Sequence, residues 1–200
     1  MFPLLGNVDI DNSECLLHMK KRELKPTTAV VPCPVVLLSV RGEERPNIIT
    51  LSWTANVCSD PPTVAVGVRP KRYSHRLMLE AGDFVLNIPS SRQFENVVFC
   101  GTKSGRDHDK FEECDFTPIP ASRVSSPMIA ECPINIECKT TRVIPLGAHD
   151  LFIAEVVAVH VDEELFESMQ ESTQFDIARL NLFTYVPLTG EYWAVGDKMD

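Results

Sequence analysis

A short basic segment is the strongest sign of chemistry in this sequence. Four cations and a histidine lie within the eight residues 69–76 (RPKRYSHR), and no acid interrupts them, although the whole chain has a net charge of −9. The segment leads into a predicted helix that has Ser74 as its N-cap, runs from His75 to Ala81 and stops at Gly82. The free N–H groups and the dipole of such a helix start favour an anion, most often a phosphate. The segment predicts a phosphate site, with an ordinary solvated turn as the alternative.

Two neighbouring segments are suited to hold a planar ring. The segment 47–56 alternates apolar and polar side chains, and its polar face carries Thr50, Ser52 and Thr54. After the turn at 59–62, the segment 63–68 alternates again, and one of its faces has only small residues: Thr63, Ala65 and Gly67. If these strands pair, hydroxyls and backbone amides would lie beside a flat surface that a flavin ring can approach closely. A strand with one solvent-facing side would show the same pattern, so both interpretations stay open.

The rest of the chain divides into short elements separated by prolines and turns. Further strands are expected at 34–40, 83–89, 132–144 and 150–161, and short helices at 92–99 and 107–114, with a loop at 100–106. The segment 150–161 is apolar on both faces, so we expect it inside the sheet. The aromatic tail after residue 181 is expected to pack back on the body. Six or more strands with short helices favour a closed or partly closed β-barrel.

The composition limits the class of protein. The 200 residues are 44% hydrophobic and 24% charged, as is usual for a single globular domain. No stretch approaches the roughly 20 apolar residues of a membrane span. The net charge of −9 argues against a protein that binds nucleic-acid phosphates over its surface. The N-terminus lacks the early positive charge of a signal peptide, so we expect a cytoplasmic location.

Several other kinds of site are disfavoured by their missing motifs. The seven cysteines contain no C-x-x-C pair, which argues against a zinc knuckle and for reduced, mostly buried thiols. The adjacent residues Asp107, His108 and Asp109 would point apart on a helix, and no further metal ligand is indicated. The chain has no G-x-S-x-G elbow, no G-x-G-x-x-G turn and no G-x-x-x-x-G-K-[ST] loop. We therefore expect no metal, no serine nucleophile and no Rossmann-type or P-loop site.

The order and spacing of several motifs resemble the flavin reductase-like, FMN-binding split-barrel proteins, and the flavoredoxin subgroup in particular. The motifs are SDPP at 59–62, an arginine at 69, FVLNIP at 84–89, SGRDHDKF at 104–111 and YWAVG at 192–196. The resemblance covers nearly the whole chain, from about Met19 to about Met199. It implies a mainly β fold, a six-stranded Greek-key split β-barrel with short peripheral helices, formed by residues 25–200 as one domain after an N-terminal extension at 1–24. It also implies a homodimer with FMN bound noncovalently near the subunit interface.

The resemblance also implies which residues bind the flavin. The ring and ribityl contacts would come from Thr50, Leu51, Ser52, Trp53 and Thr54, with a further polar contact from Ser59. The phosphate would be held by Arg69 and Ser74, together with Lys71. Lys110 would approach the N1/C2 carbonyl edge, where a cation raises the reduction potential of the flavin. Without the motif around it, Lys110 would be read as a surface lysine.

His149 is the one catalytic candidate that the resemblance implies. Flavin reductases of this superfamily commonly have a histidine at this place, near the nicotinamide side of the flavin. Many members carry an acid directly before it, whereas this chain has Ala148. Its role is therefore open between positioning the nicotinamide and supporting the strand edge.

The resulting prediction is an FMN-binding oxidoreductase of the NAD(P)H-dependent flavin reductase type, with FMN favoured over FAD by the resemblance. Electrons would come from NAD(P)H or a protein donor and pass through the flavin to a small-molecule or protein redox partner. One alternative is a flavoredoxin-type electron carrier with little direct NAD(P)H turnover. Another is a non-catalytic, dimeric flavin-binding module. No nucleic-acid or membrane partner is expected.

Overall fold

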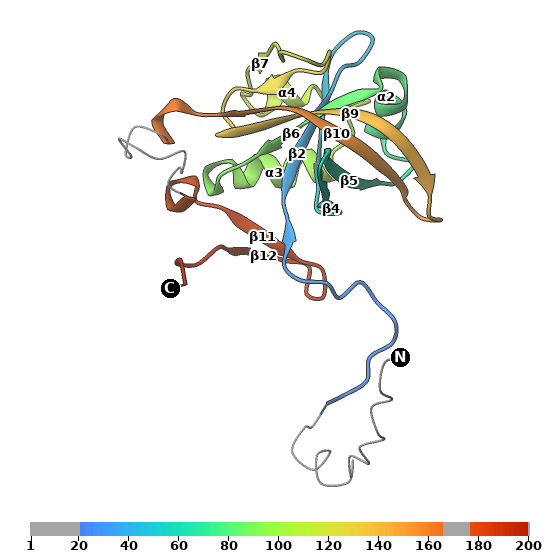
Figure 1. The fold of residues 1–200 in the computed structure, drawn as a ribbon, viewed down its shortest axis with the longest axis vertical. Helices are drawn as coiled ribbons and strands as arrows, with labels where there is room; N and C mark the ends of the chain where they lie inside the picture. The colour runs from blue at the N-terminus through green and yellow to red at the C-terminus, as the bar shows by residue number, and fades with distance from the viewer. Residues whose placement is uncertain (1–20, 166–176, 200) are drawn as a thin grey trace, which may run out of the picture.

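The structure, a computed structural model, describes residues 21–165 and 177–199 and is dominated by one antiparallel sheet (Figure 1). This sheet has seven strands in the order β3-β2-β6-β9-β10-β5-β4. Their bounds are Asn47–Leu51 (β3), Val36–Val40 (β2), Asp83–Ile88 (β6), Ile134–Pro145 (β9), Asp150–Val161 (β10), Pro62–Val68 (β5) and Thr54–Ser59 (β4). The mainly β split-barrel prediction is confirmed, with seven strands in the main sheet where six were expected.

The sheet closes on itself where the chain crosses from one edge to the other. β3 and β4 are the two edge strands, yet only Ser52 and Trp53 separate them in sequence. The N–H of Gly67 in β5 donates to the carbonyl of Trp53 at 2.7 Å, which ties the crossing to the far edge. A Cβ on Gly67 would lie 3.1 Å from the Cβ of Trp53, so glycine permits this close approach. The prediction of one strand over 47–56 is therefore wrong: two strands meet there, and only the second pairs with β5.

Two hydrophobic clusters lie on opposite sides of β2. The barrel interior contains Leu38 of β2, Phe84 of β6 and Phe152 of β10, and helix α2 (Tyr73–Ala81) adds Leu77 and Met78. The other side of β2 and β3 is covered by α3 (Phe94–Thr102) and α4 (Lys110–Glu113). All five residues of β2 are buried for this reason, since each face packs against apolar side chains.

The helices differ from their expected bounds in informative ways. Gly82 ends α2 as predicted, in a left-handed conformation with φ of 69°, and its N–H donates to Met78. The N-cap, however, is Arg72, which makes no side-chain cap hydrogen bond. Ser74 is instead buried inside the helix and accepts a hydrogen bond from Asn47 Nδ2 at 2.7 Å. α3 extends to Thr102, so its last turn occupies part of the loop expected at 100–106.

The tail packs back against the body as predicted. β11 (Phe183–Val186) lies between β1 (Cys33–Pro34) and β12 (Glu191–Ala194) in a three-stranded sheet. Figure 1 shows this hairpin beside the segment that carries β1 and apart from the main sheet. Phe183 and Tyr192 contact Phe94 of α3 edge to face, with ring centroids 5.8 and 5.3 Å away.

The remaining segments complete the fold without adding to the main sheet. β7 (Pro118–Ile119) and β8 (Met128–Ile129) pair with each other, and three short 3-10 helices lie at Ser91–Gln93, Glu163–Leu165 and Ile177–Leu180. β10 lies between β9 and β5, which confirms its predicted interior position. The extension predicted at 1–24 falls mostly outside the described residues. No helix in the described part of the chain is long and apolar enough to cross a membrane.

Candidate functional site

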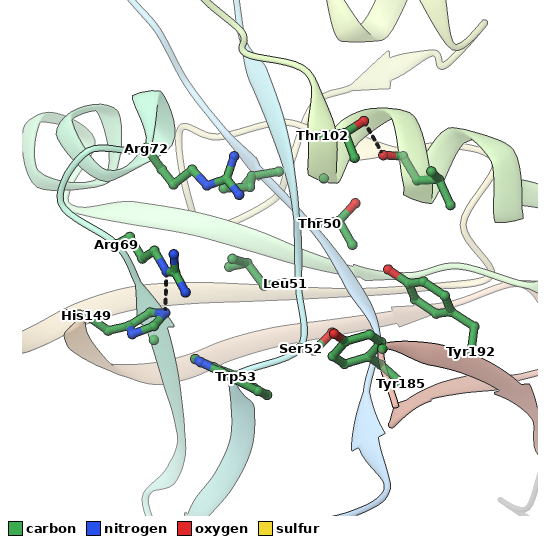
Figure 2. Close-up of a pocket in the computed structure, with 15 residues that line it drawn as sticks. Thr50, Leu51, Ser52, Trp53, Arg69, Arg72, Thr102, His149, Tyr185 and Tyr192 are labelled. Atoms are coloured by element: carbon green, nitrogen blue, oxygen red, sulfur yellow. Dashed lines mark hydrogen bonds between the residues drawn. The ribbon is translucent and has the colours of Figure 1, made fainter. Parts of the chain in front are cut away.

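A cavity of about 470 Å³ opens where the crossing between β3 and β4 meets α3 and the β11–β12 hairpin. Its floor is the segment 49–53, and one wall carries Arg69, Arg72 and His149. Figure 2 shows Tyr185 and Tyr192 on the opposite side. The size and the mixture of rings and polar groups are those of a cofactor or small-molecule site.

The floor brings together four of the residues predicted to contact a ring: Thr50, Leu51, Ser52 and Trp53. The Thr50 hydroxyl donates to the carbonyl of Val97 in α3 at 2.6 Å, so it is already used within the protein. A Cβ on Gly101 would lie 3.3 Å from the Cβ of Thr50, and glycine thus lets α3 pack closely on β3. Backbone groups at the crossing are the polar groups that this floor offers to a ligand, together with the Ser52 hydroxyl.

His149 lies directly before β10 and faces the cavity beside an arginine. Arg69 Nε donates to His149 Nε2 at 3.3 Å, and the ring centroids of His149 and Trp53 are 6.4 Å apart (Figure 2). Burial, and then the charge of Arg69, lowers the pKa of His149 below its ordinary value. The imidazole is therefore neutral at pH 7, with Nε2 as acceptor and the proton on Nδ1.

The acid beside this histidine has another partner. Asp150 follows His149 and its Oδ2 lies 2.8 Å from Nε2 of His75, in the first turn of α2. The carboxylate of Asp150 is therefore not directed at His149. The pair instead ties the start of β10 to the helix that follows the basic segment.

A second, smaller cavity of about 130 Å³ adjoins the first, and Ile49 and Arg72 line both. Its wall includes Lys71 and Ser74, two of the residues predicted to hold a phosphate. Ser74 accepts its hydrogen bond from Asn47, so its own hydroxyl proton is left to donate to a ligand. Oδ1 of Asn47 is buried and has no hydrogen-bond partner within the described part of the chain.

Lys110 also lines the smaller cavity, but it is not a surface lysine. Its side chain is buried, and Nζ donates to the carbonyls of Ile48 at 2.8 Å and Cys100 at 2.7 Å. Burial lowers the pKa of this ammonium below its ordinary value. Two of its three hydrogens hold β3 and α3 together, and one is left for a ligand.

The electrostatics of the two cavities differ from those of the whole protein. Among the described residues that line them, five are cationic and none is acidic: Arg69, Lys71, Arg72, Lys103 and Lys110. The N-terminus of α2 lies here as well, with no side chain capping it. Together they give the two cavities the positive charge and the free N–H groups that favour an anion.

Two predicted residues are not brought into either cavity. Thr54 begins β4, and its hydroxyl is buried without a partner in the described part of the chain. Ser59 is exposed at the far end of the β4–β5 hairpin, paired with Pro62. Arg69 lies in the larger cavity with His149, whereas Lys71 and Ser74 lie in the smaller one.

Sequence reasoning missed several lining residues. Arg72 was within the basic segment but was not singled out, and it is the cation common to both cavities. Tyr185 and Tyr192 come from the tail, whose aromatic content was the available signal. Thr102 and Gly190 carried no signal of their own.

Comparisons with known proteins show which family the chain belongs to. Residues 28–179 match a family model described as a flavin reductase-like domain. The structure of flavoredoxin from Desulfovibrio vulgaris (Miyazaki F) is similar, with a TM-score of 0.83 and 32% identity over 90% of this chain and 96% of that one. An FMN-binding protein from Thermus thermophilus gives a TM-score of 0.71 and 26% identity, covering 92% and 97% of the two chains. An NADPH-flavin oxidoreductase from Streptomyces viridifaciens is 28% identical over 142 residues, 70% of this chain and 72% of its own.

Proposed function

The chain belongs to the flavin reductase-like family, and on that premise we propose that it binds FMN and acts as an NAD(P)H-dependent oxidoreductase. One observation carries the proposal: a cavity floored by the β3–β4 crossing continues into a cationic cavity at the start of α2. The first cavity suits a planar ring and the second suits an anionic group. A ligand that carries both groups in one molecule would occupy the two cavities together. A flavin supplies the electron transfer when it is bound, and the protein supplies its position and environment.

We propose FMN and not FAD as the flavin. The volume of the cationic cavity, about 130 Å³, suits one terminal phosphate. Arg72, Lys71 and the Ser74 hydroxyl would hold that phosphate as charge-assisted and neutral donors. The carbonyls and N–H groups around Ser52 would meet the polar edge of the ring, and Gly67, against which Trp53 packs closely, lines the same cavity.

The proposal is tested by the visible absorption spectrum of the purified protein, followed by release of the chromophore. We expect a flavin spectrum and released FMN after denaturation, or stoichiometric uptake when FMN is added. A colourless protein that also ignores added FMN in a fluorescence titration would overturn the assignment. Steady-state oxidation of NADH and NADPH then tests the catalytic part.

We propose that His149 positions the nicotinamide on the open side of the larger cavity. The His149→Ala variant is expected to keep its full flavin content, because His149 and its partners Arg69 and Trp53 all lie outside the cationic cavity. Its reduction by NADPH should slow by up to about 100-fold, the cost of misplacing a reactant by about 1 Å. Stopped-flow bleaching of the flavin absorbance measures that rate.

The His108→Ala variant is the matched control, since His108 pairs with Glu113 outside both cavities and should leave the rate unchanged. Loss of flavin from the His149→Ala variant would contradict the positioning role and make the residue structural.

An electron-carrier role is the second candidate, favoured by the likeness to the Desulfovibrio vulgaris flavoredoxin at 32% identity. In that case the bound flavin would exchange electrons with a protein partner and turn over little NAD(P)H directly. NADPH oxidation measured with and without added free flavin distinguishes the two roles.

We further propose a homodimer in which the β11–β12 hairpin of one protomer packs against the other protomer near the mouth of the cavity. Trp193 and Leu188 on this hairpin are 59% and 48% exposed, and Tyr192 between them lines the cavity. Burying such side chains on a partner would both stabilise the assembly and complete the wall of the site. Sedimentation velocity of the wild type and the Trp193→Glu variant tests this arrangement, with a monomeric wild type as the contrary result.

We propose a cytoplasmic location because the six cysteines that the structure describes are all free thiols, five of them buried and Cys58 exposed. An unpaired exposed thiol is typical of a reducing compartment.

A further inference from the structure

Two cysteines meet behind the smaller cavity. The sulfurs of Cys100, in the last turn of α3, and Cys114, directly after α4, are 3.8 Å apart, and both side chains are buried. Neither is part of the proposed flavin chemistry. Cys132 belongs to the same hydrophobic cluster, whereas Cys138 lies in the barrel interior on the other side of the sheet.

The pair is connected directly to the wall of the site. Cys100 lines the 130 Å³ cavity, and its carbonyl accepts one of the two hydrogen bonds from Lys110. The next residues of α3, Gly101 and Thr102, line the larger cavity. A shift of α3 against α4 would therefore change both cavities at once.

The surroundings favour a reactive thiolate at Cys114. The hydrogen bond from the Cys100 thiol lowers the pKa of Cys114 most, and the charge of Lys110 lowers it further against the effect of burial. The same interaction, together with burial, raises the pKa of Cys100. We assign the first attack to Cys114, the thiol with the lowered pKa, and the resolving step to Cys100, 3.8 Å away.

We propose that Cys100 and Cys114 form a reversible dithiol–disulfide centre in the wall of the site, and that its oxidation weakens flavin binding. The second half of this proposal rests on the proposed function. The oxidant is a peroxide. It would reach the pair through the cavity that Cys100 lines, and the Cys114 sulfur lies 3.8 Å beyond the Cys100 sulfur.

The chemistry balances in two steps. The Cys114 thiolate attacks hydrogen peroxide, so that an S–O bond forms, the O–O bond breaks, and the departing hydroxide takes up a proton to give water. The Cys100 thiol then attacks the sulfenic sulfur, the S–S bond forms, the S–O bond breaks, and a second water leaves. Two thiols are oxidised as one peroxide is reduced, and an external dithiol reverses the change by exchange.

Closing this bond must bring the two sulfurs closer together, by rotation of the side chains and by movement of the elements that carry them. A disulfide needs a sulfur separation of about 2.05 Å, compared with 3.8 Å here. We infer that the end of α4 is drawn toward α3, and such a movement would displace Lys110, which is on α4 and donates to the carbonyls of Ile48 and Cys100. The floor and the cationic cavity would then lose their present spacing.

The disulfide is tested on the full chain by mass spectrometry. The protein is treated with hydrogen peroxide, alkylated, digested with trypsin and analysed without reduction. We expect the peptide 93–103, which contains Cys100, linked to the peptide 111–123, which contains Cys114. The Cys138→Ala variant should give the same linkage and the Cys114→Ser variant should not. Free alkylated Cys100 and Cys114, or a linkage of Cys100 to the peptide carrying Cys132, would overturn the proposal.

The effect on the site is tested by titrating FMN into reduced and oxidised protein. We expect the dissociation constant to rise by about fivefold or more on oxidation, the lower end of coupling between sites, and to recover with dithiothreitol. The Cys114→Ser variant should show no such change. An unchanged dissociation constant in protein whose disulfide has formed would overturn the coupling. Absence of FMN binding by the reduced protein would overturn the proposed function instead, and the mass spectra would still decide whether the disulfide forms.

Discussion

Replacing Arg72 by alanine is expected to raise the dissociation constant for FMN by roughly 10- to 150-fold, because a hydrogen bond to a charged group contributes about 1.5–3 kcal/mol. Arg72 lies at the junction of the two cavities, beside the uncapped start of α2, and is the cation that both cavities share. A terminal phosphate next to Ser74 would face its guanidinium. Fluorescence titration of flavin into the variant and the wild type measures the change.

The comparison with riboflavin isolates the phosphate. Riboflavin lacks that group, so the Arg72→Ala change should affect its binding little. Arg69→Ala is the matched control, since Arg69 is an exposed arginine of the same segment but lies in the ring cavity against His149. It should affect FMN and riboflavin alike. If Arg69→Ala weakens FMN selectively while Arg72→Ala does not, Arg69 holds the phosphate and the assignment to the smaller cavity is wrong.

The free energy of unfolding of the Glu137→Gln variant is expected to be about 3–5 kcal/mol lower than that of the wild type. This is the usual cost of removing one member of a buried charged pair. Glu137 lies in β9 with a fully buried side chain. Its oxygens accept from the N–H groups of Ser122, Arg123 and Val124 and from the Ser122 hydroxyl, at 2.6–3.1 Å. Nε2 of His160 lies 2.6 Å from the same carboxylate. A glutamine would direct an NH₂ group at these donors and leave some of them unpaired.

The same carboxylate makes the stability depend on pH. Burial alone would raise its pKa, but hydrogen bonds from Ser122, His160 and Arg123 lower it from 4.5 to about 2. That difference in pKa corresponds to a contribution of about 3 kcal/mol to the free energy of unfolding. Because the folded pKa is the lower one, the contribution is complete above pH 4.5 and is lost as the pH falls toward 2. The wild type should therefore lose stability steeply in this range, and the Glu137→Gln variant much less so.

Urea denaturation of both proteins between pH 3 and pH 7 measures the two effects. Glu155→Gln is the control, because it makes the same change of charge at an exposed position of β10. It should alter the free energy of unfolding by less than about 0.5 kcal/mol. Equal losses in the two variants would show that the loop at 122–124 contributes nothing through Glu137.

Local signals predicted those parts of the fold that short-range geometry controls. Gly82 ends α2 because its left-handed φ is accessible to glycine at little cost. The two apolar faces of the segment 150–161 predict an interior strand, and β10 does lie between β9 and β5, although only Phe152 and Ala154 in it are buried. The family and its split barrel also followed from the order of motifs that are individually weak.

Other features depended on contacts between distant segments. The alternation at 47–56 continues through Ser52 and Trp53, so nothing local reveals that the chain there leaves one sheet edge for the other. Serine is a residue type common at N-caps, yet the Ser74 hydroxyl accepts a hydrogen bond from Asn47, 27 positions earlier. A local signal cannot distinguish the two uses of the same oxygen.

The sequence by itself determined the basic segment before a helix and the polar strand face beside small residues. The order of its motifs also determined the family. Only the tertiary structure decided which of those groups lies in the larger cavity and which in the smaller one. It placed Arg69 with His149 and Arg72 with Ser74, and it buried the Lys110 ammonium between two carbonyls. The physical reason is that side-chain type is local, whereas the direction and burial of a side chain are set by barrel closure and by the helices packed against it.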